Sequence, residues 1–466
     1  MLIGIACLLV FLAMAALMYT RRLSALLALP IMALFIALVG GIPAPDILSK
    51  VVSEGALKLH NAYTTTMFGA MLAELVNRQG IAKAVIRWVA EFSGDNPFVL
   101  GILLTAVTAL LFSTLGGLGA VIMVGTIVLP VMLSLGIANI TAGALFLFGI
   151  SLGGMFNLAS WQLYIDVLNI DREQIAFFVV RFAAIMAALV LAFLAIELKK
   201  PSNIKFIVAM LVVLAPGFAI LSLATPAGDN VGASTSSLSV LIVGVVGASL
   251  VGYAASRHVK GWTHLPGAAM LTPFIPLVLV LACHWDIIPA FVAGIAYGAL
   301  ITWQRGSINA LTRSIIDGVS AVIPAVVLMI GIGMLLAAVM HPSVAGAVAP
   351  LLTQIVPTHA LLYVIVFTAI APLSLYRGPL SLWGMGSGLV ALVQKATTLQ
   401  SSAIMGMLMS VGQIQGVCDP TNTHNIWIAT YLGTDTQVLL RRTIPYVWLG
   451  VFAGLCLAVT CGFVSW

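Results

Sequence analysis

The chain has 466 residues, of which 62% are hydrophobic and only 7% are charged. A soluble domain carries about one quarter charged residues, so this composition excludes a water-soluble protein and predicts an all-α membrane protein. The 20 Lys and Arg outnumber the 14 Asp and Glu, which gives a net charge of +6. Such an excess is typical of short cytoplasmic loops and does not indicate a nucleic-acid partner. The five cysteines lack the spacing of metal ligands, so we expect no metal and no cofactor.

Apolar stretches of the length that a membrane crossing needs, roughly 20 residues, recur along the whole chain. In chain order they are Leu2–Tyr19, Leu23–Gly41, Asn61–Val76, Ile175–Ile196, Phe206–Ala224, Ser239–Ala255, Ala268–Cys283, Ile288–Trp303, Gly318–Met340 and Ile444–Val464. Four further apolar segments are interrupted by Gly, Pro or Asn: Phe98–Leu135, Ala144–Tyr164, Leu361–Val393 and Ala403–Tyr431. Together they predict about 10–12 transmembrane helices, with re-entrant hairpins or broken helices at the interrupted segments.

Basic residues mark the loops that we expect on the cytoplasmic side of a bacterial inner membrane. The positive-inside rule places there Arg21 and Arg22, Arg78 to Arg87, Lys199 to Lys205, Arg257 and Lys260, Arg305 and Arg313, and Arg441 and Arg442. The loop Thr225–Ser237 has no Lys or Arg and is then external, and both termini are predicted to be periplasmic. Because no basic residue precedes the first apolar stretch, we interpret it as a retained helix and not a signal peptide.

The sequence also contains an internal repeat. A shift of 263 positions aligns Glu54-Gly55 with Asp317-Gly318 and Met71-Leu72 with Met334-Leu335. The basic loops give the two copies opposite orientations, which predicts a first inverted repeat at 1–200, a two-helix linker at 201–261 and a second inverted repeat at 262–466. Inverted repeats are typical of secondary transporters, because two near-equivalent conformations give alternating access to a central site.

In the first copy the interrupted segments contain a glycine turn and an asparagine. The turn reads Ser113-Thr114-Leu115-Gly116-Gly117-Leu118-Gly119, and Asn157 lies in Gly153–Trp161. Helix ends that meet at such a turn can point free N–H groups at an anion, and the hydroxyls can cap the helices. The alternative is a packing kink of small residues. Candidate substrate-binding residues here are Ser113, Thr114, Gly116, Gly117, Gly119 and Asn157.

In the second copy an arginine lies deep inside an apolar stretch, in Ser374–Leu380. A guanidinium at membrane depth is costly unless it is paired, so Arg377 is a functional candidate. A substrate carboxylate would match its fork-shaped donor geometry. The alternative is a structural ion pair with a distant acid such as Asp419. We expect Arg377 and Gly378 to bind substrate.

The most polar run of the chain, Gly416–Asn425, lies between two apolar arms. Its side chains predict hydrogen bonds to substrate oxygens from Thr421, Asn422, Thr423 and Asn425. Asp419 and His424 are the candidate proton carriers, because burial and a nearby anion move their titration toward neutral pH. Asp419 could instead be the ion-pair partner of Arg377 or a cation ligand. The alternative interpretation of the whole run Gly416–Asn425 is a loop exposed to water.

Three other acidic residues are expected to be structural. Glu74 is four residues before Arg78, the spacing of a local ion pair on a helix. Glu54 and Asp317, at equivalent positions of the repeat, are expected at helix starts, where an acid suits the helix dipole.

Paired breaks of this kind in an inverted repeat resemble the ion transporter superfamily, and Met67–Leu135 is most similar to its gluconate:proton and citrate symporter branches. The resemblance implies a scaffold and a moving transport domain with two re-entrant hairpins, an elevator-like motion and a homodimer. In the sodium-coupled dicarboxylate branch the hairpin tips carry Ser-Asn-Thr. Here the matching places read Ser113-Thr114-Leu115 and Thr421-Asn422-Thr423, and only the second is close, which favours H⁺ over Na⁺ as the coupling ion.

The sequence therefore predicts a multi-pass secondary transporter that imports a small organic anion, such as gluconate, citrate or a dicarboxylate, by proton symport. The alternatives are an anion efflux pump and a passive anion channel. We expect no catalytic residues, because the chain contains neither a metalloprotease motif nor a nucleophile elbow.

Overall fold

The computed structural model describes residues 2–20, 22–93, 96–198, 236–260, 264–353, 356–378, 380–383, 386, 390, 393–394 and 397–464. Within these ranges every regular element is a helix, and no strand occurs, which confirms the predicted all-α fold class. The predicted crossing Phe206–Ala224, nearly all of the loop Thr225–Ser237 and the first half of the predicted linker lie outside the described residues.

The chain divides into two compact units, each built from separate stretches of sequence. Unit 1 comprises Met1–Tyr63, Trp161–Leu189 and Ile323–Trp466, and unit 2 comprises Thr64–Ser160 and Val190–Val322. The boundaries fall inside four helices, so the chain passes from one unit to the other within α5 (His60–Arg78), α10 (Leu158–Leu168), α11 (Arg172–Leu198) and α16 (Ser307–Met340).

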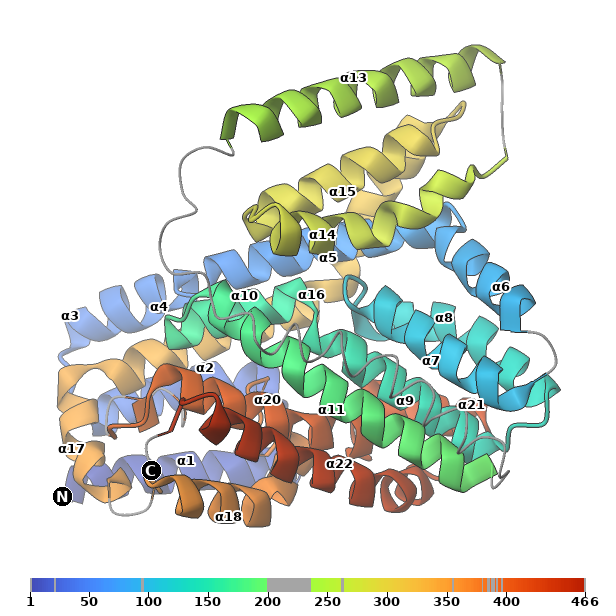
Figure 1. Ribbon diagram of the computed structural model, residues 1–466. Coiled ribbons are helices and arrows are strands. Elements are labelled where there is room, and N and C mark those ends of the chain that lie inside the picture. The colour runs from blue at the N-terminus through green and yellow to red at the C-terminus, as the bar shows by residue number, and fades with distance from the viewer. Residues whose placement is uncertain are drawn as a thin grey trace. The chain divides into compact units, whose positions relative to one another are not determined.

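Unit 1 holds both ends of the described chain (Figure 1). Besides its parts of the four shared helices, its elements are α1 (Leu2–Tyr19), α2 (Ala25–Val39), α3 (Ala44–Asp46), the π-helical η1 (Ile47–Glu54), α4 (Gly55–Leu57), α17 (Pro342–Leu352), α18 (Ala360–Ile370), the 3₁₀-helical η3 (Ala371–Arg377), α20 (Ser401–Cys418), α21 (Thr423–Tyr431) and α22 (Thr436–Thr460).

Unit 2 contains the glycine turn of the first copy. Besides its parts of the shared helices, its elements are α6 (Ile81–Ser93), α7 (Pro97–Phe112), α8 (Gly117–Ser134), α9 (Asn139–Met155), α13 (Ser236–Lys260), the 3₁₀-helical η2 (Gly267–Phe274), α14 (Ile275–Ala282) and α15 (Ile287–Ile301).

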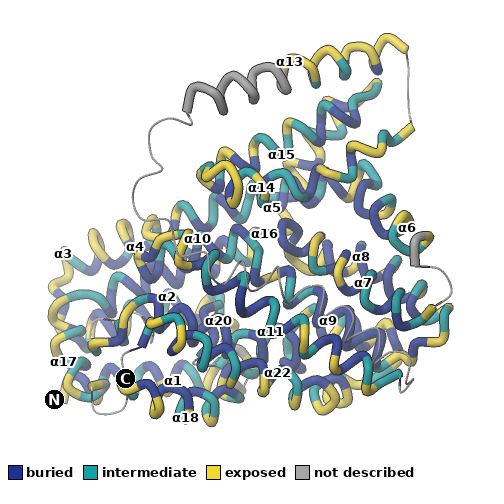
Figure 2. Tube along the Cα trace, viewed as in Figure 1, coloured by how far each residue is buried: buried dark blue, intermediate teal, exposed yellow. Residues whose placement is uncertain are grey.

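Each unit is organised around one helix that is buried along most of its length. This helix is α9 in unit 2 and α20 in unit 1 (Figure 2). Helix α9 packs against α7 and α8, and α20 packs against α22 and η3. Both helices are predominantly apolar, which is typical of a helix surrounded by other helices.

Several apolar helices are long enough to cross a membrane. Among the described residues these are α8, α11, α16 and α22, and a fifth crossing is formed if α9 and α10, which are bent by 51° at their junction, count as one. The other predicted crossings within the described residues are mostly apolar helices of 10–17 residues. The chain is therefore a multi-pass membrane protein.

Two predicted features differ from the structure. The stretch Ala268–Cys283 is two short pieces, η2 and α14, because Pro273 and Pro276 remove backbone donors from the helix. Neither Asp317 nor Glu54 starts a helical segment, since α16 begins at Ser307 and Glu54 is the last residue of η1, within the continuous run of α3, η1 and α4.

Candidate functional site

The glycine turn of unit 2 lies between α7 and α8, as predicted. The hydroxyls of Ser113 and Thr114 donate to carbonyl oxygens of α7, at 2.7 Å from Leu110 O and 3.3 Å from Leu111 O. Both side chains are buried. They therefore close the end of α7, where the last carbonyl groups have no intrahelical partner.

The glycines that follow are exposed and have room around them. Gly117 has a φ of +81°, a left-handed conformation that glycine adopts without steric cost. A Cβ atom added to Gly116, Gly117 or Gly119 would meet no heavy atom within 4 Å. The first N–H groups of α8, which have no intrahelical acceptor, thus belong to an open turn that can receive an anion.

Asn157 connects the two breaks of unit 2. Its Nδ2 lies 3.3 Å from Phe112 O and 3.2 Å from Leu115 O, and its Oδ1 accepts from the N–H groups of Ala159 and Ser160 at 3.1 and 3.3 Å. Two donated and two accepted bonds use the capacity of one carboxamide. Asn157 therefore caps α10 and fastens the α9–α10 bend to the glycine turn, and its role toward substrate stays a prediction.

In unit 1 the break around Arg377 is a sharp turn of the backbone. Leu375 is extended, with ψ of 156°, and Tyr376 is left-handed, with φ of 59°. A Cβ atom at Gly378 would overlap the carbonyl oxygen of Leu373, so this position requires glycine. Arg377 is the last residue of η3, and its side chain lies outside the described part of the structure, as does any pair that it forms with Asp419.

Serines on both sides of Arg377 hold this segment against α20. The Ser374 hydroxyl lies 2.8 Å from Ala371 O and 3.3 Å from Val411 O of α20. The Ser381 hydroxyl donates to Oε1 of Gln415 at 2.6 Å. The backbone at Arg377 and Gly378 therefore lies beside the end of α20, next to the polar run that follows it.

That polar run separates α20 from α21 and surrounds a buried carboxyl group. Asp419 is 0% exposed, and its Oδ1 accepts from the N–H and the hydroxyl of Thr421 at 2.8 and 2.7 Å. Asn425 is 3% exposed and donates to Val417 O at 3.0 Å. Its Oδ1 has no hydrogen-bond partner among the described residues, so this polar run contains a buried acceptor that is open.

His424 belongs to a chain of polar groups that reaches the Arg377 segment. Its Nε2 lies 3.1 Å from Gly416 O and 3.1 Å from Nδ2 of Asn422. Asn422 Nδ2 in turn lies 3.5 Å from the carbonyl oxygen of Gln415. Because Gln415 also accepts from Ser381, the two breaks of unit 1 are connected through the end of α20. Thr423, the first residue of α21, is exposed.

The predicted site residues thus form two groups. Ser113, Thr114, Asn157 and the glycine turn lie in unit 2, whereas Gly378, Asp419, Thr421, Asn422, His424 and Asn425 lie in unit 1. Sequence reasoning missed Gln415 and Ser381. Gln415 could have been found, because a carboxamide inside an otherwise apolar helix needs a partner.

A third missed residue is Asp166, on α10. Its carboxylate accepts from the N–H of Ala62, at the start of α5, and from Nε2 of Gln162, at 3.0 and 2.8 Å. It therefore joins α10 to the beginning of α5. The signal was available in the sequence, since Asp166 is the single acid in the apolar run after Asn157. Within the described chain, no three His, Cys, Asp or Glu side chains gather as metal ligands do.

Comparison with known proteins places the fold. No protein-family model and no curated protein matches the chain. A solved structure of the YdaH transporter of Alcanivorax borkumensis matches with a TM-score of 0.51 and 16% identity, over 94% of this chain and 98% of that one. The MtrF transporter of Neisseria gonorrhoeae, described as one of a class of antimetabolite efflux pumps, matches with a TM-score of 0.51 and 15% identity, over 93% of each chain.

These similarities support the predicted transporter fold but not the predicted family branches. Both structures are of transporters, and neither is a gluconate or citrate carrier, so placement in those branches has no support from the comparisons. At 15 and 16% identity the likeness extends to the fold and not to substrate. The chain therefore has a transporter fold, shared with YdaH and MtrF.

Proposed function

We propose that the protein is a secondary active transporter that moves a small organic anion through alternating access, coupled to protons. The observation that carries this proposal is that the elements of the second half of the chain repeat those of the first at one constant shift. Inverted repeats of this kind give a transporter two near-equivalent conformations. A channel or an intramembrane enzyme has no comparable need for them.

The same shift of 263 positions that aligns the sequence also relates the helices. It carries α7 onto α18 and η3, α9 onto α20, and α11 onto α22. The two shorter helices α6 and α17 correspond as well. Each broken element of unit 2 thus has a counterpart in unit 1, which supports the repeats at 1–200 and 262–466.

Packing contacts within the two units are exchanged between the copies. In unit 1 a Cβ added to Gly55 would lie 2.9 Å from Cα of Met334, and in unit 2 a Cβ added to Gly318 would lie 2.9 Å from Cα of Met71. Gly318 is the repeat equivalent of Gly55, and Met334 is that of Met71. When two copies are related by a twofold axis, each contact of the first copy with the second is matched by the equivalent contact of the second copy with the first.

The chemistry of the breaks supports an anion as the solute. The open glycine turn before α8 offers N–H groups at the positive end of a helix dipole, and Arg377 offers a fork for a carboxylate. The buried Asp419 and the neighbouring His424 are the candidates for carrying the proton. The hydroxyls of a sugar acid or hydroxycarboxylate could form hydrogen bonds with the polar groups of the same run, which are Thr421, Asn422, Thr423 and the open Oδ1 of Asn425.

The test begins with a substrate and then removes the arginine. A thermal-shift screen of purified protein against carboxylates and sugar acids identifies an anion, whose proton-driven transport is then measured in proteoliposomes. We expect Arg377→Ala to lower the apparent affinity at least tenfold, because the carboxylate loses its bidentate partner. Arg441→Ala, an exposed arginine on α22, is the control and should transport normally. Undiminished affinity in Arg377→Ala would remove Arg377 from the site.

The likeness to MtrF favours export as a second candidate direction. Anion uptake measured under an inward and under an outward proton gradient distinguishes the two. Import by symport moves the anion and the proton in the same direction, whereas proton-driven export moves them in opposite directions. For an exporter, a deletion strain should become sensitive to a toxic anion. Conductance without accumulation against a gradient would indicate a channel and contradict active transport.

A further inference from the structure

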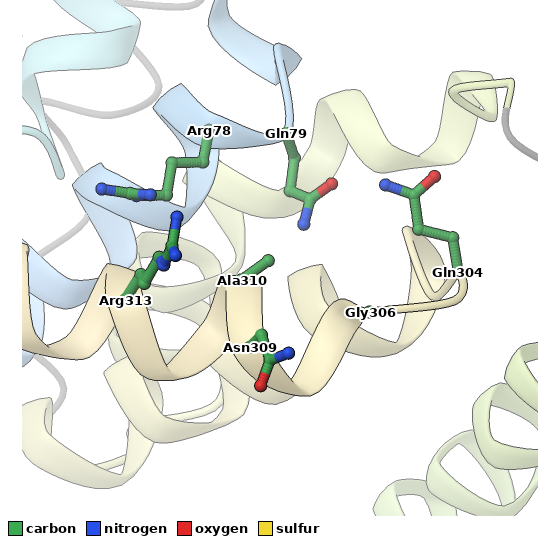
Figure 3. Close-up of a pocket in the computed structure, with 7 residues that line it drawn as sticks. All are labelled: Arg78, Gln79, Gln304, Gly306, Asn309, Ala310 and Arg313. Atoms are coloured by element: carbon green, nitrogen blue, oxygen red, sulfur yellow. The ribbon is translucent and has the colours of Figure 1, made fainter.

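A polar cavity in unit 2 belongs to none of the breaks described above. It has a volume of about 440 Å³ and is lined by Arg78, Gln79, Gln304, Gly306, Asn309, Ala310 and Arg313. These residues come from the end of α5, the loop before α16 and the first two turns of α16. Figure 3 shows the side chains of Arg78 and Arg313 close together on one side, with Gln79 and Gln304 facing each other on the other.

The two arginines of this cavity differ in their ion pairs. Arg78 is held by two carboxylates, with its Nε 2.7 Å from Glu74 Oε1 and its Nη2 paired with Asp317. Arg313 is exposed and forms no ion pair with any residue that the structure describes. The exposed guanidinium of Arg313 can therefore bind an external anion, and three carboxamides supply further donors. The lining therefore suits an anion with several acceptor oxygens.

The length of α16 places this cavity near the surface of the bilayer. The helix has 34 residues and is about 51 Å long at 1.5 Å per residue, whereas the hydrocarbon core is about 30 Å thick. Its first turns therefore extend into the headgroup region. Beside the cavity, α16 exposes Ile308 (67%) and Ile316 (58%), side chains that suit lipid acyl chains.

We propose that this cavity binds the phosphate group of an anionic phospholipid, with Arg313 as its principal ligand and Arg78 beside it on the same side. Phosphate presents several acceptor oxygens to paired guanidinium groups. Basic cavities between helices on the cytoplasmic side of membrane proteins are suited to anionic headgroups. Free phosphate has the same chemistry, and the exposed isoleucines favour the lipid as its source.

The experiment measures lipid retention by native mass spectrometry of the full chain, incubated with phosphatidylglycerol or phosphatidylcholine. We expect the wild type to retain phosphatidylglycerol selectively and Arg313→Gln to retain at least fivefold less. Arg305→Gln is the matched control, because Arg305 is an exposed arginine of the preceding loop that does not line the cavity. Asn309→Asp, which puts a negative charge into the cavity, should lower retention in the same way.

A parallel thermal-shift titration with inorganic phosphate distinguishes the source. In one outcome, phosphate stabilises the wild type but not Arg313→Gln, while both proteins retain the same amount of lipid. This result would support a phosphate site and would assign it to a soluble anion. Equal lipid retention and an equal phosphate response in the wild type and Arg313→Gln would overturn the proposal. So would an equal loss of lipid in Arg305→Gln and Arg313→Gln, since this would reveal only a general effect of charge.

Discussion

At the scale of single residues, the polar side chains at the helix breaks act first on the protein's own backbone. Ser113 and Thr114 close α7, Asn157 caps α10, and Thr421 donates to Asp419. A break in an apolar helix leaves carbonyl and N–H groups that lipid cannot satisfy. Hydroxyls and carboxamides at a break are therefore needed for stability, whatever they also contribute to substrate binding.

Substitution of Asn157 tests whether a polar side chain at a break contributes to stability, to substrate binding or to both. Asn157→Ala removes the cap of α10 and leaves the carbonyls of Phe112 and Leu115 without their donors, so we expect unfolding to become easier by about 2–3 kcal/mol. Asn96, which caps α7 through a single bond to Phe98 N at 3.0 Å, is the comparison, and Asn96→Ala should cost about 1 kcal/mol. Denaturation in detergent measures both.

Equal losses in the two variants would show that the bonds from Asn157 to the glycine turn contribute nothing. Normal stability of Asn157→Ala with weakened transport would instead assign the side chain to the substrate.

The sequence predicts where the breaks occur better than it predicts their bonds. Clusters of Gly, Pro, Asn and Ser interrupt apolar runs, and these local signals located the turn at Ser113–Gly119 and the break at Asp419. The bond from Asn157 to Phe112 joins residues 45 positions apart. It depends on how α9 packs against α7, which no local pattern specifies.

At the scale of elements, hydropathy predicted the length of apolar helices that no internal proline pair interrupts. The predicted Leu2–Tyr19 and Ile288–Trp303 correspond to α1 and α15. The short helices α6 and α17, of 13 and 11 residues, were not predicted as elements, because a crossing criterion selects stretches of roughly 20 residues. In α6, Lys83 and Arg87 are exposed while Ile81, Val85 and Ile86 are buried, which is the periodicity of a helix lying on a surface.

Close approach of α7 and α9 depends on small residues along one face of α9. A Cβ at Gly149 would lie 2.7 Å from Thr108 Cβ, and a Cβ at Gly153 would overlap Ala109 O. The two glycines are four residues apart, the spacing that lets transmembrane helices pack backbone to backbone. Gly153 was noted in the sequence only as part of a break, but its structural role is in this packing.

We expect Gly153→Ala to destabilise the protein by about 1–3 kcal/mol, because the added methyl group forces α9 away from α7. Gly154→Ala is the control one residue further on, where no atom lies within 4 Å of the new Cβ. It should be neutral or stabilising by up to about 1 kcal/mol. Melting temperatures in detergent provide the comparison, and an equal response of both variants would contradict the packing argument.

At the scale of the whole molecule, the two units are interleaved in sequence. Unit 2 combines Thr64–Ser160 of the first copy with Val190–Val322, which includes the opening helices of the second. Unit 1 combines Met1–Tyr63 and Trp161–Leu189 of the first copy with Ile323–Trp466 of the second. The repeat was visible in the sequence as a common register of weak matches. The exchanged pairing of segments was not, because it is set by which helices pack together.

The exchanged contacts predict matched effects of matched substitutions. Gly55→Ala and Gly318→Ala each place a methyl group against the backbone of another helix, at Met334 and Met71. We expect both to cost about 1–3 kcal/mol of stability, by similar amounts. Gly346→Ala, where a Cβ has open space, should have little effect. A large loss at one of the two positions and none at the other, in the same unfolding assay, would argue against the twofold relation.

The passage of the chain between the units inside helices has a mechanical consequence. A loop absorbs displacement by rotating about single bonds, whereas a helix transmits it along a ladder of hydrogen bonds. The boundary in α16 falls between Val322 and Ile323, one residue before Pro324. Proline has no N–H to give to that ladder, so α16 resists bending least at this point. We therefore expect bending of α16 to be concentrated at Pro324, where one backbone hydrogen bond of the helix is missing.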